Sequence, residues 1–184
     1  TDGANLAERI MRAARTAAIR LYREFDLADH DKWDKVLEEA RKGNQEALKF
    51  VGHQQEPDKH PVCQKILTFI GPGKRGGEIR DHFTSPPYGW SRDAIDGALY
   101  ALVASGHLRV TDASGSPLDA KTLDRNKLTQ ANFRRESITV TPQQKIRIRA
   151  LFNELKVPCQ LGEELTKAPQ LIRKLRELAS AAGG

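Results

Sequence analysis

The chain has 184 residues, 39% of them hydrophobic and 29% charged, and a formal net charge of +6. This composition is typical of a globular protein and excludes collagenous and strongly disordered classes. No stretch is apolar enough to cross a membrane, and no targeting segment is recognisable. Two cysteines, Cys63 and Cys159, are too few for a disulfide scaffold, so we expect free thiols and a cytoplasmic location.

The positive charge is concentrated at one end of the sequence. Residues 121–184 hold 13 basic and 6 acidic residues, whereas residues 58–120 hold 7 of each. Because phosphates and acidic surfaces attract clustered cations, we expect any such attraction to centre on the last third.

The N-terminal part, residues 1–57, is expected to be helical. Apolar residues at helical spacing predict a long amphipathic helix over 4–25, and two shorter helices should follow over 33–43 and 45–51. Residues 52–61 contain two prolines and no periodicity, which indicates a linker. The apolar positions of the long helix are Leu6, Ile10, Ala14, Ala17, Leu21 and Phe25.

The central part, residues 58–120, has the order of elements of a winged helix-turn-helix. A rigid aromatic turn at 86–90 leads directly into an amphipathic helix that ends before a β-prone run. Winged helices dock on DNA or on other proteins. The expected elements are helices over 62–70, 76–83 and 91–105, a strand over 108–110, and a small β-wing with its tip at 114–116.

The last part, residues 121–184, is expected to be a basic helical region. Thr141 followed by Pro142 is typical of a helix start, and leucines at helical spacing predict a final helix. The expected elements are a helix over 123–131, a β-prone run over 133–140, a helix over 142–155 that buries Ile146, Ala150 and Leu151, and a last helix containing Leu171, Leu175 and Leu178. The predicted fold class is therefore mainly α, with N-terminal helices, a central winged helix and C-terminal helices.

The third helix of the predicted winged helix is the element that would enter a DNA major groove. Its predicted outer face repels phosphate, because it carries one positive and two negative side chains. Docking on a protein or packing within the chain is therefore favoured over base reading. The residues expected on that outer face are Arg92, Asp93, Asp96, Gly97, Tyr100 and Ala101.

Two sets of residues are candidates for binding. Tyr88, Trp90 and Tyr100 are candidate protein-interaction residues, because exposed aromatics dominate many interfaces; the alternative for Tyr88 and Trp90 is packing over the core. A set of four basic residues is the candidate nucleic-acid-binding set, and its alternative is an ordinary solvated surface. That set is Arg134, Arg135, Lys145 and Arg149.

No catalytic, metal or cofactor site is predicted. The run 71–77 is rich in glycine, but it lacks the Gly-Lys-Ser/Thr spacing of a phosphate-binding loop and follows a predicted helix. His60 and Cys63 lack the further ligands that a structural zinc site needs. No serine or cysteine lies in a nucleophile motif.

Several segments resemble a region of the large P-loop ATPases of BREX phage-defence systems, the BrxC/PglY family. They are His60-Pro61-Val62, the turn at 87–90 with the following 93–99, Phe133-Arg134-Arg135-Glu136, and Ala182-Gly183-Gly184. Since this chain has no Walker motif, the resemblance implies a region outside the nucleotide-binding domain. We therefore expect a non-catalytic interaction or regulatory region that docks other BREX components or the parent ATPase domain. The alternative is a module that binds double-stranded DNA through the basic last third.

Overall fold

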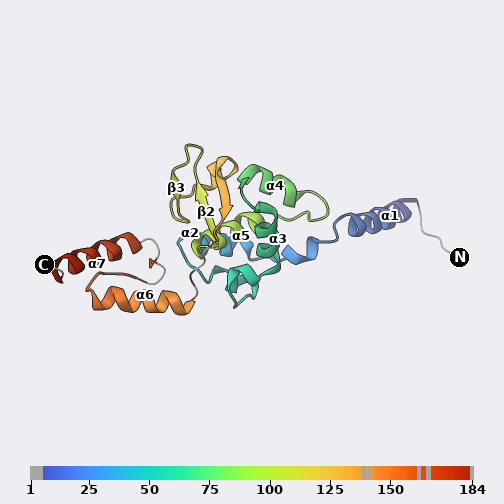
Figure 1. The fold of residues 1–184 in the computed structure, drawn as a ribbon. Coiled ribbons are helices and arrows are strands. Elements are labelled where there is room, and N and C mark those ends of the chain that lie inside the picture. Colours follow the sequence, from blue (N-terminus) through green and yellow to red (C-terminus); the bar gives the residue numbers. More distant parts are fainter. Residues whose placement is uncertain (1–5, 138–139, 141, 161–162, 165–166, 183–184) are drawn as a thin grey trace. The chain divides into compact units, whose positions relative to one another are not determined.

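The computed structural model describes residues 6–137, 140, 142–160, 163–164 and 167–182. They form two compact units, Thr1–Glu136 and Ser137–Gly184 (Figure 1). The expected mainly helical class is confirmed, with a small antiparallel sheet in the first unit. The α-helices of the first unit are α1 (Leu6–Leu21), α2 (Trp33–Arg41), α3 (Pro61–Ile70), α4 (Gly76–Thr84) and α5 (Arg92–Ala104). Those of the second are α6 (Pro142–Glu154) and α7 (Ala168–Ala182).

The sheet joins strands that lie far apart in the sequence. Its order is β1-β4-β2-β3, and every neighbouring pair is antiparallel. The connection from β2 to β4 contains both β3 and the 3-10 helix η4, so it is far longer than a hairpin turn. The strands are β1 (Lys74–Arg75), β2 (Leu108–Thr111), β3 (Pro117–Leu118) and β4 (Asn132–Arg135), and η4 spans Arg125–Gln130.

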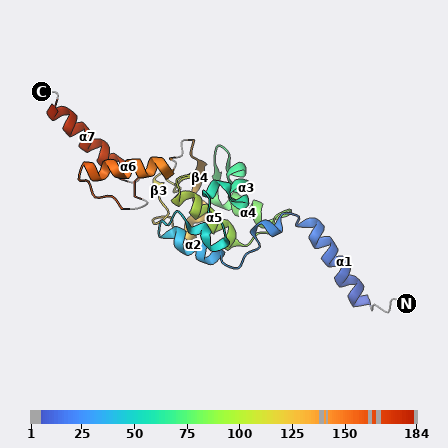
Figure 2. The same ribbon diagram turned by 90° about the horizontal axis from the view of Figure 1, so that it is seen from below.

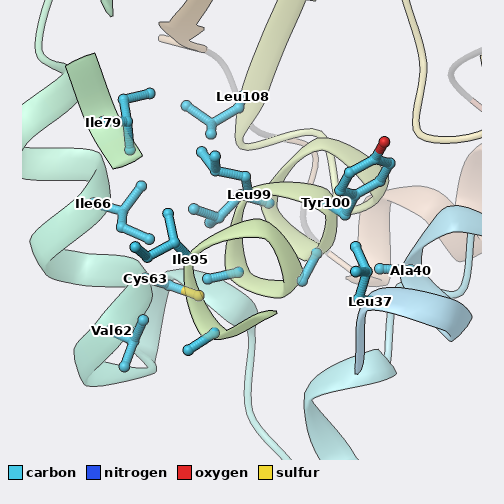
Figure 3. Packing of buried hydrophobic residues seen from close by; sticks show 14 of the residues in the cluster. Leu37, Ala40, Val62, Cys63, Ile66, Ile79, Ile95, Leu99, Tyr100 and Leu108 are labelled. Atoms are coloured by element: carbon cyan, nitrogen blue, oxygen red, sulfur yellow. The ribbon is translucent and has the colours of Figure 1, made fainter. Parts of the chain in front are cut away.

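Helix α5 lies at the centre of the first unit. It begins where the Ser91 hydroxyl accepts a hydrogen bond from the Ala94 amide at 3.1 Å, which satisfies a free N–H of the first turn. Helix α2 packs along it in both ribbon views (Figures 1 and 2). Figure 3 shows Leu37 and Ala40 of α2 on one side of α5, and Val62, Cys63 and Ile66 of α3 on the other.

Several elements differ from the sequence expectations. The expected helices over 45–51 and 123–131 are shorter 3-10 helices, η2 (Ala47–Val51) and η4. The expected linker over 52–61 contains the 3-10 helix η3 (Pro57–Lys59) and the buried His60. Strand β1 was not predicted, because glycines and a proline precede it. Residues 121–136, grouped in the sequence with the C-terminal part, belong to the first compact unit.

Helix α6 has the expected extent but not the expected buried face. Ile146 and Leu151, predicted to be buried, are exposed, whereas Phe152 and Lys145 are buried. The helical spacing identified the element without identifying which of its faces is covered. The predicted cap Thr141 lies outside the described residues. Among the residues that the structure describes, no helix is long and apolar enough to cross a membrane.

The closest approach between the β2–β4 connection and α4 is at Gly76. A Cβ added there would lie 2.0 Å from the Leu128 carbonyl oxygen, and the Gly76 amide donates to the Ala131 carbonyl at 2.9 Å. Because backbone atoms cannot move aside cheaply, we expect Gly76→Ala to lower the free energy of unfolding by about 1–3 kcal/mol. Gly77→Ala is the matched control, since its Cβ would be 3.3 Å from the Thr129 carbonyl oxygen. Equal losses in denaturant titrations would contradict this account.

His60 makes stability depend on pH. Its Nδ1 accepts the Val62 amide at 3.2 Å and so caps α3, and its ring packs edge-on against Trp33. Burial, followed by the nearby His53, lowers the pKa of His60 from 6.5 to about 4. The unfolded chain therefore binds the proton more tightly, and stability is lost as pH falls from 6.5 to about 4.

We expect His60→Asn to reduce this loss, because asparagine can cap the helix and does not titrate. The contribution is on the order of 3 kcal/mol at full protonation. Urea titrations between pH 6.5 and 4 measure it, with the exposed His30→Asn as the control. If both variants change the pH dependence to the same extent, His60 is not the titrating group.

Candidate functional site

The first unit contains an ion cluster in which two arginines surround the buried Asp96. This carboxylate on α5 is fully buried. The Arg80 guanidinium on α4 donates to both of its oxygens at 2.8 Å, and Arg125 of η4 donates to one of them at 2.7 Å. Arg125 also pairs with Asp93, one turn earlier on α5. One carboxylate therefore joins α4, α5 and the β2–β4 connection.

The predicted recognition face of α5 is enclosed. Nine of its residues are buried, including Asp96, Gly97, Tyr100 and Ala101, which were expected on its outer face. A Cβ at Gly97 would lie 3.2 Å from both the indole and the carbonyl oxygen of Trp33, so α2 passes very close to α5 at this point. The expectation of an exposed face was wrong for these four residues, which α2, α4 and the β2–β4 connection cover, whereas Arg92 is exposed and Asp93 half-exposed, as expected.

The three candidate protein-interaction residues are part of the core or lie against it. Trp90 is 2% exposed, stacks on Phe83 at 4.7 Å and donates from its indole to the Glu24 carbonyl at 2.8 Å. Tyr88 is half-buried against the same aromatic pair. The alternative of core packing is thus the observed one for Tyr88 and Trp90.

Tyr100 is fully buried, so its predicted place on the outer face is corrected. Its hydroxyl donates to the Leu123 carbonyl at 2.6 Å, which joins α5 to the segment before η4. Burial raises the pKa of Tyr100 to about 12, so the hydroxyl stays protonated as the donor. None of the three aromatics projects freely from the surface as an interface anchor would.

The four candidate nucleic-acid-binding residues are divided between the two compact units. In the first unit, Arg134 and Arg135 are both exposed, but as successive residues of β4 they point to opposite faces of the sheet. In the second unit, Lys145 is buried, and Arg149 pairs at 2.6 Å with Glu164, itself 1% exposed. Lys145 and Arg149 are therefore engaged within the fold and are poorly placed to contact phosphate.

A different set of arginines shares one face of the sheet. Phe133, Val110 and Leu118 occupy one cross-strand row, and the first two are fully buried. The next rows face the opposite way: Arg134 lies across from Arg109, and Arg75 lies across from Asn132. We call the side with Arg75, Arg109 and Arg134 the outer sheet face; all three side chains are exposed.

Arg75 and Arg109 were not among the binding residues predicted from the sequence. The alternation of buried Leu108, exposed Arg109 and buried Val110 was a visible signal that Arg109 points outward. The register that pairs β1 and β2 with β4 is not visible in the sequence. It is this register that brings arginines from three strands together.

A serine, a histidine and an aspartate also lie close together, at the end of α5. The Ser105 hydroxyl is 2.8 Å from His107 Nδ1, and His107 Nε2 is 3.7 Å from Asp58. Ser105 is 4% exposed and its hydroxyl also lies 3.2 Å from the Leu102 carbonyl, so no substrate carbonyl can reach it. This group closes the helix end. Within the described residues, no group of three or more metal-binding side chains occurs.

Comparisons of the chain with protein-family models, with curated proteins and with solved structures give no match.

The Asp96 cluster predicts a large difference between two neighbouring aspartates. Asp96→Asn leaves the largely buried Arg80 without its counter-charge, so we expect a loss of about 3 kcal/mol or more in the free energy of unfolding. Asp93→Asn, at a half-exposed carboxylate that also pairs with Arg125, should cost less than about 1 kcal/mol. Denaturant titrations of both variants measure this, and equal losses would refute a structural role specific to Asp96.

Proposed function

We propose that this chain is a non-catalytic, winged-helix interaction region of a BREX-type anti-phage defence ATPase. The order α3, β1, α4, α5, β2, β4 supports the winged-helix interpretation, with β3 and η4 as parts of an enlarged wing. The sequence resemblance to BREX ATPases supports the parent family. The cytoplasmic location expected from the two cysteines fits such a parent.

The enclosure of α5 is the observation that carries this proposal. A winged helix that reads DNA inserts its third helix into the major groove, with side chains free to reach base edges. Here α2 covers that helix and η4 is tied to it through Arg125. A unit of this kind is suited to docking through its other surfaces.

Helix α1 is the docking element that we favour. None of its residues is buried, and Leu6, Ile10 and Leu21 on one face are 74%, 59% and 53% exposed. An exposed apolar stripe of this size on a helix is the usual counterpart of a hydrophobic groove. Arg9 and Arg20 flank this stripe on one side, and Arg12 and Arg15 lie farther round the helix, so a groove with an acidic rim is the matching surface.

We propose that this groove lies on the ATPase domain of the parent BREX-type protein. A second copy of this chain is a poorer match, because two α1 helices packed through their apolar stripes would bring the flanking Arg9 and Arg20 of both copies close together. Docking of α1 on the ATPase domain would let this region influence nucleotide hydrolysis without taking part in the chemistry.

The test is binding of this chain to the separately purified ATPase domain of its parent. Titration calorimetry should detect a complex, and Ile10→Asp should weaken it at least tenfold, because a charge then enters the apolar groove. Thr16→Asp adds the same charge on the arginine-bearing face and is the matched control. No complex, or equal effects of the two variants, would overturn docking through α1.

DNA binding is the second candidate function. Arg134, which the sequence singled out, is exposed on the outer sheet face with two further arginines. The buried state of α5 argues against base reading, so contact with the phosphate backbone is the form of binding that this candidate takes.

A further inference from the structure

We infer that the outer sheet face binds the phosphate backbone of a duplex nucleic acid without reading its bases. This inference rests on the second candidate function and is independent of docking through α1. It names the surface, Arg75, Arg109 and Arg134, and the class of ligand.

The outer sheet face gathers three positive charges from neighbouring strands. The antiparallel register puts Arg109 directly across from Arg134, and Arg75 lies in the adjacent row. Like charges directly opposite each other destabilise a sheet, and Glu136 offsets the charge of Arg109 alone, so a further anion over the pair would relieve the remaining repulsion. Guanidinium groups bind phosphate oxygens through two parallel hydrogen bonds, which suits them to this ligand.

The second argument is how these side chains are held. Arg134 donates to the Pro72 carbonyl at 3.0 Å, and Arg109 lies 3.1 Å from Glu136. These contacts hold both side chains in place. Glu136 neutralises only part of the positive charge of the outer sheet face. Among the described ion pairs, neither Arg75 nor Arg134 has a carboxylate partner. The face keeps a net positive charge.

The side chains of the outer sheet face fit a nucleic acid better than an acidic protein. Protein interfaces draw most of their energy from buried aromatic and aliphatic anchors. The outward positions beside the arginines are the polar Asn132 and Thr111 and the small Pro117, and no large exposed hydrophobic side chain belongs to the described strands. Binding to phosphate needs only cations and hydrogen-bond donors, which this face supplies.

Other basic groups in the chain are less suited to this role. On α7, the residues Arg173, Lys174 and Arg176 are spread around the helix, and Lys174 is near Glu177. On α1, the arginines border the apolar stripe and belong to the proposed docking element. Within the part of the chain that the structure describes, the outer sheet face is the surface that combines three exposed arginines on neighbouring strands with polar neighbours.

The experiment is fluorescence anisotropy of a short labelled DNA duplex titrated with the full chain at several salt concentrations. We expect the affinity to fall steeply with salt, because each neutralised phosphate releases counterions. The triple variant Arg75→Ala, Arg109→Ala, Arg134→Ala should weaken binding roughly tenfold or more at low salt and reduce the log–log salt slope by about two to three. The matching triple substitution to lysine should keep most of the affinity, which separates loss of charge from loss of fold.

Two control variants remove the same number of charges elsewhere. One replaces Arg173, Lys174 and Arg176 with alanine, and the other replaces Arg9, Arg12 and Arg20. Both control variants should bind DNA nearly as well as the unaltered chain. If a control loses binding and the outer-face variant retains it, the inference is wrong while DNA binding as a function stands.

Two further outcomes bear on the ligand. If the unaltered chain fails to bind the duplex even at low salt, DNA binding itself fails and this inference fails with it. If polyglutamate displaces the labelled duplex as effectively as unlabelled DNA does, the face is a general acidic-partner surface and the nucleic-acid assignment is overturned. Sequence-scrambled duplexes should bind equally well, since no base edge is read.

Discussion

The burial of α5 is the constraint on which the rest of the first unit depends. Its small and apolar residues let α2 lie against one side and α3 against the other, while Ile95 and Leu99 face Ile79 and Leu108 across the core (Figure 3). Since both sides are covered, the helix cannot be a free reading surface. Any interaction of this unit must use elements that surround α5.

The ion cluster explains how the long β2–β4 connection is held in place. A buried carboxylate is costly unless its charge is matched, and Asp96 is matched by two arginines from different elements. Arg125 is thereby fixed over α5, and the Leu128 carbonyl is pressed against Gly76. The connection is a packed part of the fold and is larger than the small β-wing that the sequence predicted. Its tip at Gly115 remains exposed.

Local chemistry allowed most helices to be predicted, and tertiary contacts determined what the predictions missed. Ser91, Pro61 and the glycines near Gly71 mark helix ends through their own backbone preferences, so α3 and α5 were found within a residue or two. The exposure of Tyr100 and Asp96 was mispredicted because Leu123 and Arg125, which contact them, come from residues that the sequence grouped with the C-terminal part. The pairing of β1 with β4 spans almost sixty residues and leaves no local pattern.

The arginines of the outer sheet face differ from those of the ion cluster in what neutralises their charge. Arg80 and Arg125 form ion pairs with the buried Asp96 carboxylate, so the fold itself requires their charge. Arg109 and Arg134 face each other across two strands, and small polar residues at these positions would pair with less repulsion. Folding alone therefore does not account for the charge of this pair. The proposed phosphate ligand would supply closely spaced negative charges to both guanidinium groups at once, beyond the single carboxylate that Glu136 offers to Arg109.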